Sequence, residues 1–149
     1  MDTTPSTTGV DERQLAVDLF NHCWTLLARD GRSRDEEDEM LHAAHASRFH
    51  WGRVGGPENR ARGEWQCSRV YCVLGRAEPA LHHARRCLEL CEEHGLADWD
   101  LAFAYEALAR AHRVAGDDGE AERFRELART VPVAEAEDRE LLESDLASI

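Results

Sequence analysis

The sequence predicts an all-α protein, and three observations support that prediction. Alanine and leucine dominate the apolar residues, whereas valine is sparse and isoleucine occurs once, at Ile149. Good helix formers therefore outnumber β-branched residues. Apolar residues recur three and four positions apart, as they do on one face of a helix. Glycine and proline interrupt this pattern repeatedly, as expected between helices.

The first helix is predicted to follow a segment rich in Thr, Ser, Pro and Gly, Met1 to Val10, which we expect to be a disordered tail. It runs from about Asp11 to Arg29, where leucines share one helical face, and Gly31 supplies the usual stop. The remainder of the chain, residues 11–149, is predicted to be a single domain, since domains of about 100 to 150 residues are common.

The second helix begins at a run of acidic residues, Asp35 to Glu39. Acidic residues in a first turn are stabilised by the positive end of the helix dipole, so we interpret the run as a helix start. An acidic docking site is the alternative. This helix continues to about Trp51, and a glycine- and proline-rich segment, residues 52–57, ends it.

Five further helices are predicted from the same signals of helical spacing, glycine stops and proline in a first turn. They span about Glu58 to Leu74, Pro79 to His94, Asp98 to Ala115, Gly119 to Thr130 and Ala134 to Leu146.

The charge of the chain excludes several functions. It carries 30 acidic and 18 basic residues, a net charge of -12, which argues against binding nucleic acid or an anionic membrane surface. All basic residues are arginine, so lysine-dependent chemistry such as a Schiff base or a P-loop is excluded. A GC-rich coding sequence explains the missing lysines most simply. With no apolar run of about 20 residues and no secretory signal, we expect a cytoplasmic bacterial protein.

Helix pairs recur about every 40 residues. Placing Gly75 over Gly116, an offset of 41, aligns Arg69 with Arg110, Ala80 with Ala121, and Cys87 with Ala128. Earlier in the chain, Leu41-His42-x-Ala44 matches Leu81-His82-x-Ala84 at an offset of 40, with Ser47 on Cys87. Gly31 precedes Gly75 by 44 residues, so the first pair carries a few additional loop residues.

At these positions the chain resembles the tetratricopeptide-type (TPR-like) repeat. The pattern of a large residue, a glycine, an alanine and a small residue is met by Tyr71, Gly75, Ala80 and Cys87, and again by His112, Gly116, Ala121 and Ala128. A spacing of 40 to 41 instead of about 34 resembles the longer-helix variants of this family. The resemblance covers about residues 11–130. It implies a right-handed α-solenoid of three antiparallel helix pairs, followed by a C-terminal capping helix.

The resemblance also implies that the first helix of each pair lines a concave groove. The aligned groove positions are Arg62, Trp65, Arg69 and Val73, followed by Phe103, Glu106, Arg110, Arg113 and Val114. Arginine binds carboxylates and phosphates through two hydrogen bonds, and Trp and Arg are frequent at binding hot spots. The alternative is that these arginines pair with neighbouring acids, such as Glu64 or Asp100.

Histidines supply the second candidate site. His42, His45 and His50 lie on one predicted helix, which also carries Trp51. A Glu-x-x-His step, here Glu39 to His42, can place two metal ligands on one face, as in di-iron helical bundles. The sequence offers no second step of the right spacing. We therefore expect no metal or cofactor and favour histidines that are solvated or hydrogen-bonded.

The cysteines are predicted to be reduced thiols, mostly in the core, because free cysteine is among the most buried residue types. Their spacing matches no structural zinc pattern, although a metal or redox role is the alternative. They are Cys23, Cys67, Cys72, Cys87 and Cys91. We expect a core that includes Cys67, Tyr71, Ala84, Cys87, Leu88, Leu108 and Ala128.

Three functions are consistent with these observations. The leading hypothesis is a non-enzymatic interaction module that binds a protein or peptide partner through an anionic group in the arginine- and tryptophan-lined groove. The alternative is a small-molecule-binding protein or enzyme that uses the histidine cluster, with or without a metal. A third is a homo-oligomeric scaffold joined through Trp24, Trp99 or the last helix.

Overall fold

The structure, a computed structural model, describes residues 9–149 and confirms the all-α prediction. It contains seven helices and, within those residues, no strand. The helices are α1 (Glu12–Leu27), α2 (Arg34–Val54), α3 (Pro57–Val73), α4 (Ala77–His94), α5 (Asp98–Val114), α6 (Asp118–Thr130) and α7 (Ala136–Ala147). Most of the expected tail, Met1 to Val10, lies outside the described residues, and Gly9 and Val10 are exposed and non-helical.

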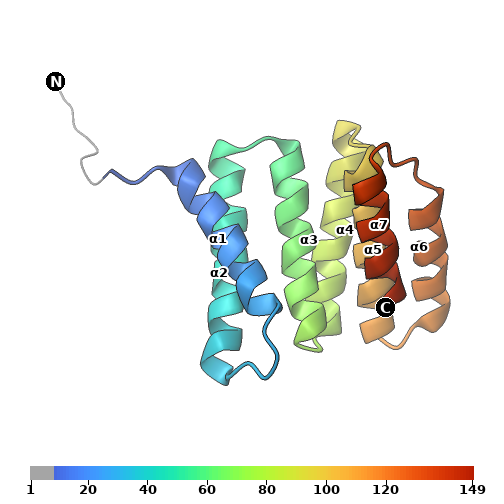
Figure 1. Cartoon of the computed structure of the whole chain (residues 1–149), viewed down its shortest axis with the longest axis horizontal. Helices are drawn as coiled ribbons and strands as arrows, with labels where there is room; N and C mark the ends of the chain where they lie inside the picture. Colours follow the sequence, from blue (N-terminus) through green and yellow to red (C-terminus); the bar gives the residue numbers. More distant parts are fainter. Residues whose placement is uncertain (1–8) are drawn as a thin grey trace.

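Consecutive helices run in opposite directions, and α2, α3, α4, α5 and α6 follow one another in chain order across Figure 1, with α1 in front of α2 and α7 in front of α5. The helices α1 and α2, α3 and α4, and α5 and α6 form closely packed pairs. Between pairs, α3 packs against α2 and α5, whereas α1 packs only loosely on α3. No helix in the described part of the chain is both long enough and apolar enough to cross a membrane.

The helix starts follow the capping rules. Asp11 accepts a hydrogen bond from the Gln14 backbone N–H at 3.1 Å, which caps α1. Ser33 and Glu36 form a reciprocal capping box at the start of α2. The acidic run beginning at Asp35 therefore occupies the first turn of α2, so its interpretation as a helix start is confirmed.

Fully buried residues recur in the second helix of each pair at positions related by 40 or 41. Along α2, α4 and α6 they are Met40, Ala80 and Ala121. The short side chains of Ala80 and Ala121 let the helices of their pairs approach closely, whereas a large side chain, Met40, fills this position in the first pair. Of the seven residues predicted for the core, five are buried. Tyr71 and Leu88 are only half-buried, so that prediction is wrong for these two.

The close packing of α2 and α3 depends on Gly63. A Cβ atom at this position would lie 2.8 Å from Cδ of Arg48 and 3.4 Å from its Cα atom. Glycine in a helix interior costs about 1 kcal/mol relative to alanine, and here that cost permits the approach of α2.

The last helix, α7, packs against α5 and lies in front of it in Figure 1. Leu142 and Leu146 of α7 are fully buried and cluster with Phe103. The connection to α7 is fixed by Asp98, which has a φ of 56° and accepts a hydrogen bond from the Ala134 backbone N–H at 2.8 Å. Asp tolerates this left-handed conformation better than most residues.

Candidate functional site

Three residues spaced 41 apart form a continuous row across α1, α3 and α5. They are Trp24, Trp65 and Glu106. The two indole rings are tilted against each other with centroids 5.3 Å apart. The Trp65 Nε1–H donates to Glu106 Oε1 at 2.8 Å. Equivalent positions on neighbouring first helices are therefore in direct contact.

Glu106 also holds two of the predicted groove arginines. Its side chain is 0% exposed, and Arg110 Nε donates to its Oε2 at 2.9 Å. Nη1 of Arg69 lies 3.5 Å from the same Oε2 and 3.7 Å from Asp145 Oδ2 of α7. A buried carboxylate requires such partners, since an isolated charge is costly to bury. Glu106 thus positions the arginines and does not itself face an open surface.

The arginines line two adjoining pockets that share Val73 and Arg110. The volumes are about 380 and 230 Å³. We call the combined surface the arginine groove, and it lies at the C-terminal ends of α1, α3 and α5 beside the end of α7. Its lining residues are Trp24, Leu27, Ala28, Arg69, Cys72, Val73, Arg110, Arg113, Val114, Ser148 and Ile149. Three of them are arginine, none is acidic, and most of the others are apolar.

Arg69 carries the clearest unsatisfied group in this groove. Its side chain is 18% exposed, and the Nη1 atom is buried without a hydrogen-bond partner among the described residues. The guanidinium also lies over the Trp24 ring, 5.9 Å from its centroid. The Glu106 and Asp145 carboxylates, 3.5 and 3.7 Å away, compensate its charge, so a ligand in the groove would meet the exposed part of the guanidinium.

Residues at the end of α7 already accept hydrogen bonds from Arg110. Its Nη2 donates to the Asp145 backbone carbonyl and to Ser148 Oγ, both at 2.9 Å. Arg113 pairs with Asp118 at 3.2 Å. Phe103, which the repeat alignment places in the groove, is 6% exposed and lies beneath α7. The predicted groove is therefore shortened on the α5 side by α7.

Arg62 lies at the opposite end of α3 and is already paired. Its Nε and Nη2 atoms donate to Asp100 at 2.8 and 3.0 Å, and its guanidinium lies 4.4 Å from the Trp99 ring centroid. This bidentate pair raises the pKa of Arg62, despite its partial burial. The alternative interpretation, in which groove arginines pair with nearby acids, therefore holds for Arg62 with Asp100. It holds as well for Arg69 and Arg110 with Glu106, and for Arg113 with Asp118.

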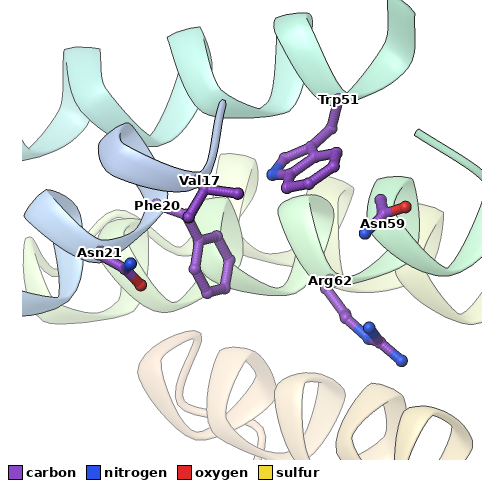
Figure 2. A pocket seen from close by; sticks show the side chains of 6 residues that line it. All are labelled: Val17, Phe20, Asn21, Trp51, Asn59 and Arg62. Atoms are coloured by element: carbon purple, nitrogen blue, oxygen red, sulfur yellow. The ribbon is translucent and has the colours of Figure 1, made fainter. Parts of the chain in front are cut away.

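Beside Arg62 lies a smaller pocket of about 160 Å³, which we call the Trp51 pocket. Figure 2 shows its side chains surrounding a common space between α1, α2 and α3. They are Val17, Phe20, Asn21, Trp51, Asn59 and Arg62. Because Asp100 neutralises Arg62, this pocket presents apolar and amide groups without a net charge.

The structure separates the four residues of the histidine-based site. His42 is exposed, and His50 Nδ1 lies 2.8 Å from Glu12 Oε2 on α1. His45 points instead toward α3, with Nε2 2.9 Å from the Tyr71 hydroxyl. Trp51 belongs to the pocket just described. The four side chains therefore do not converge on one small-molecule site.

A polar network of half-buried side chains around the buried Glu64 joins His45 to α3 and α4. Tyr71 stacks on His83 with ring centroids 5.7 Å apart, and His83 Nδ1 lies 2.8 Å from Glu64 Oε1. Arg48 Nε donates to the other oxygen of Glu64 at 2.6 Å. Burial acts to raise the pKa of Glu64, but the hydrogen bonds from His83 and Arg48 lower it below its usual value. These histidine nitrogens bond to protein groups, which favours a structural role.

The cysteines are all free and buried, as predicted. Burial raises the pKa of Cys23 to about 12 and that of Cys72 to about 11, so both are protonated thiols at neutral pH. Among residues 9–149, no three His, Cys, Asp or Glu side chains are grouped so that they could hold a metal ion. The absence of a bound metal or cofactor stays a prediction.

Several residues of the arginine groove were not predicted from the sequence. Trp24 enters the row because it precedes Trp65 by 41 residues, whereas the glycine alignment gave 44 for the first repeat. An offset of 41 residues between the first and third helices would have aligned Trp24 with Trp65. Ser148 and Ile149 of the groove carried no such signal, and neither did Asp145 beside Arg69, since the position of α7 on α5 follows from tertiary packing.

Comparison of the chain with models of known protein families, with curated proteins and with solved structures found no match in any of the three. The site's own geometry therefore carries the functional argument.

Proposed function

We propose that the chain is a TPR-like interaction module that binds an acidic segment of a partner protein in the arginine groove. In this proposal the three helix pairs stack as a right-handed solenoid with α7 as the capping helix. The recurrence of contacts at 41 residues supports that architecture, since Trp24, Trp65 and Glu106 occupy equivalent positions.

The composition of the arginine groove is the observation that carries the proposal. Three arginines and no acidic residue line it, in a chain whose net charge is -12. The exposed part of Val73 and the Trp24 ring supply apolar contacts between them. A carboxylate with an apolar neighbour matches this surface, because arginine forks bind carboxylates directionally and the tryptophan ring contributes contact area.

Glu106 supports the same function indirectly. By accepting hydrogen bonds from Trp65 and Arg110, it fixes side chains that would otherwise lose much rotamer freedom on binding. Each immobilised long side chain costs about 0.5 to 1.5 kcal/mol, so prior ordering favours affinity.

A peptide array tests the proposal. Twelve-residue peptides of matched apolar content and net charge of about -4, 0 and +4 would be measured by fluorescence anisotropy at low and high salt. We expect tightest binding by the acidic set, with an affinity that falls as salt rises. Equal binding by all three sets, or binding that does not depend on salt, would contradict the proposal.

A further inference from the structure

We infer that the Trp51 pocket is a second subsite, which takes one uncharged apolar side chain of the same acidic partner segment. This inference rests on the proposed function and specifies the partner's sequence pattern. It follows from the alignment of the two surfaces, their different charge and the size of the pocket.

The two surfaces are separate pockets that follow one another along the line where α1 meets α3. On α1, the residues of the Trp51 pocket and of the arginine groove fall on a single helical stripe, formed by Val17, Phe20, Asn21, Trp24, Leu27 and Ala28. On α3, Asn59 and Arg62 line the pocket, and Arg69 and Val73 line the groove. Between the two surfaces α1 and α3 touch, through the Trp24 and Trp65 rings and a hydrogen bond from Gln66 Nε2 to the Phe20 carbonyl oxygen at 3.0 Å.

Contacts between aromatic rings connect the Trp51 pocket to the arginine groove. Phe20 of the pocket contacts Trp24 of the groove edge-on, with ring centroids 6.4 Å apart. Trp24 in turn contacts Trp65 on α3. A peptide that bridges the two subsites would therefore pass over the rings of Phe20, Trp24 and Trp65.

The size and chemistry of the pocket select its occupant. A volume of about 160 Å³ is close to the roughly 150 Å³ of a cavity that accepts benzene, so one Phe, Leu or Met side chain fits. Val17, Phe20 and Trp51 provide apolar walls, as Figure 2 shows, while Asn21 and Asn59 border them with amides. The pairing of Arg62 with Asp100 removes the positive charge that would favour an acidic side chain here.

Helix geometry sets the spacing between the two anchors. Asn21 and Ala28 are seven residues apart, as are Arg62 and Arg69, which corresponds to about 10 Å along each helix axis. Along the axis of α3, Arg62 and Val73 are about 16 Å apart, by the same helical rise per residue. An extended peptide advances about 3.3 Å per residue. The apolar residue should therefore lie about three to five residues from the acidic group.

The test is a selection from a display library of random 12-residue peptides on the full chain. We expect enriched peptides to contain Asp or Glu together with Phe, Leu or Met about three to five residues away. In the tightest peptide, replacing that apolar residue with alanine should weaken binding to the parent at least tenfold, as the loss of one buried side chain implies.

Variants that block the Trp51 pocket distinguish a failure of this inference from a failure of the proposed function. Asn21→Trp places a bulky ring at the exposed rim, and Val17→Phe fills the space from its wall. Both should abolish the apolar preference while acidic peptides are still enriched. The control Ser144→Trp adds a ring at an exposed position of α7, away from the pocket, and should leave the selection unchanged.

Acidic peptides without a spaced apolar residue, or an apolar preference that survives both blocking variants, would overturn the inference and leave the proposed function standing. A selection with no acidic preference, or no enriched peptide, would overturn both.

Discussion

The Trp65 indole N–H donates to Glu106 Oε1 at 2.8 Å, between α3 and α5 and across 41 residues of sequence. The contact joins two positions that the proposed repeat makes equivalent. Glu106 is fully buried, and its second oxygen accepts from Arg110. The stability of the chain and the shape of the arginine groove therefore depend on the same carboxylate.

Replacing this carboxylate should destabilise the protein strongly. Glu106→Gln keeps an acceptor for Trp65 but leaves the half-buried Arg110 without a counter-charge, and leaves Arg69 with Asp145 alone, at 3.7 Å. Breaking a buried ion pair from one side costs about 3 to 5 kcal/mol, and we expect a loss of about 3 kcal/mol in urea unfolding. The control Glu140→Gln, at an exposed position of α7, should change stability little. If Glu106→Gln lowered the unfolding free energy by less than about 1 kcal/mol, the arginines would not require the Glu106 charge for stability.

Core packing gives a second prediction. Leu108 is 2% exposed and packs between α4 and α5, so Leu108→Ala should lower the unfolding free energy by about 2 to 5 kcal/mol. Leu141, which is 56% exposed on α7, provides the matched control. Leu141→Ala should have little effect on thermal unfolding. Similar melting temperatures for the two variants would disprove the helix register described above.

The helices were predictable because their signals are local. Asp35 to Glu39 indicated a helix start, and the seven predicted helices match the structure to within a few residues at most ends. Spacing of 41 also indicated which residues of α3 and α5 would be equivalent. Contacts between helices were harder to predict, because side chains such as Arg62 reach partners that the local pattern does not reveal.

The histidines illustrate the limit of the sequence argument. His42 and His45 are three residues apart on α2, yet His42 is exposed and His45 bonds to Tyr71 on α3. Their separation follows from the burial of one helix face, and the partner of His45 lies 26 residues away. Similarly, no sequence pattern placed Asp145 beside Arg69, because α7 falls outside the repeat.

Stability should fall as the pH is lowered from about 7.5 to 5.5. Burial lowers the pKa of His45, helped by the nearby His83, and burial likewise lowers the pKa of His112. The unfolded chain therefore binds protons near the ordinary histidine pKa of about 6.5 while the folded chain does not. The neutral histidines therefore stabilise the folded protein above about pH 6.5. This stabilisation is lost as the pH falls toward the lower pKa values that His45 and His112 have in the folded state.

Thermal unfolding across this range checks the histidine prediction. A double variant, His45→Gln with His112→Gln, should show a shallower dependence of melting temperature on pH than the parent. The exposed His94 is the control, and His94→Gln should keep the parent's slope. An unchanged slope in the double variant would assign the pH dependence to other groups.

The thiols should be unreactive in the folded protein. All five cysteines are buried, and burial raises the pKa of Cys23, Cys67 and Cys72 well above neutrality. Since the thiolate is the reactive form, we expect negligible reaction with Ellman's reagent until guanidinium exposes all five. Rapid reaction of any thiol in native buffer would contradict the burial described here.

The most direct test of the arginine groove compares binding and stability in the same variants. For the tightest acidic peptide, Arg69→Gln and Arg113→Gln should each lower the affinity at least tenfold, since each removes a charged donor from the groove. The unfolding free energy should change by less than about 1 kcal/mol, because Arg110 still donates to Glu106 when Arg69 is replaced, and Asp118, the partner of Arg113, is exposed. Arg86→Gln, on the exposed side of α4, is the control and should leave both quantities unchanged. Affinities equal to the parent's for both groove variants, or a loss of stability without a loss of affinity, would contradict the account.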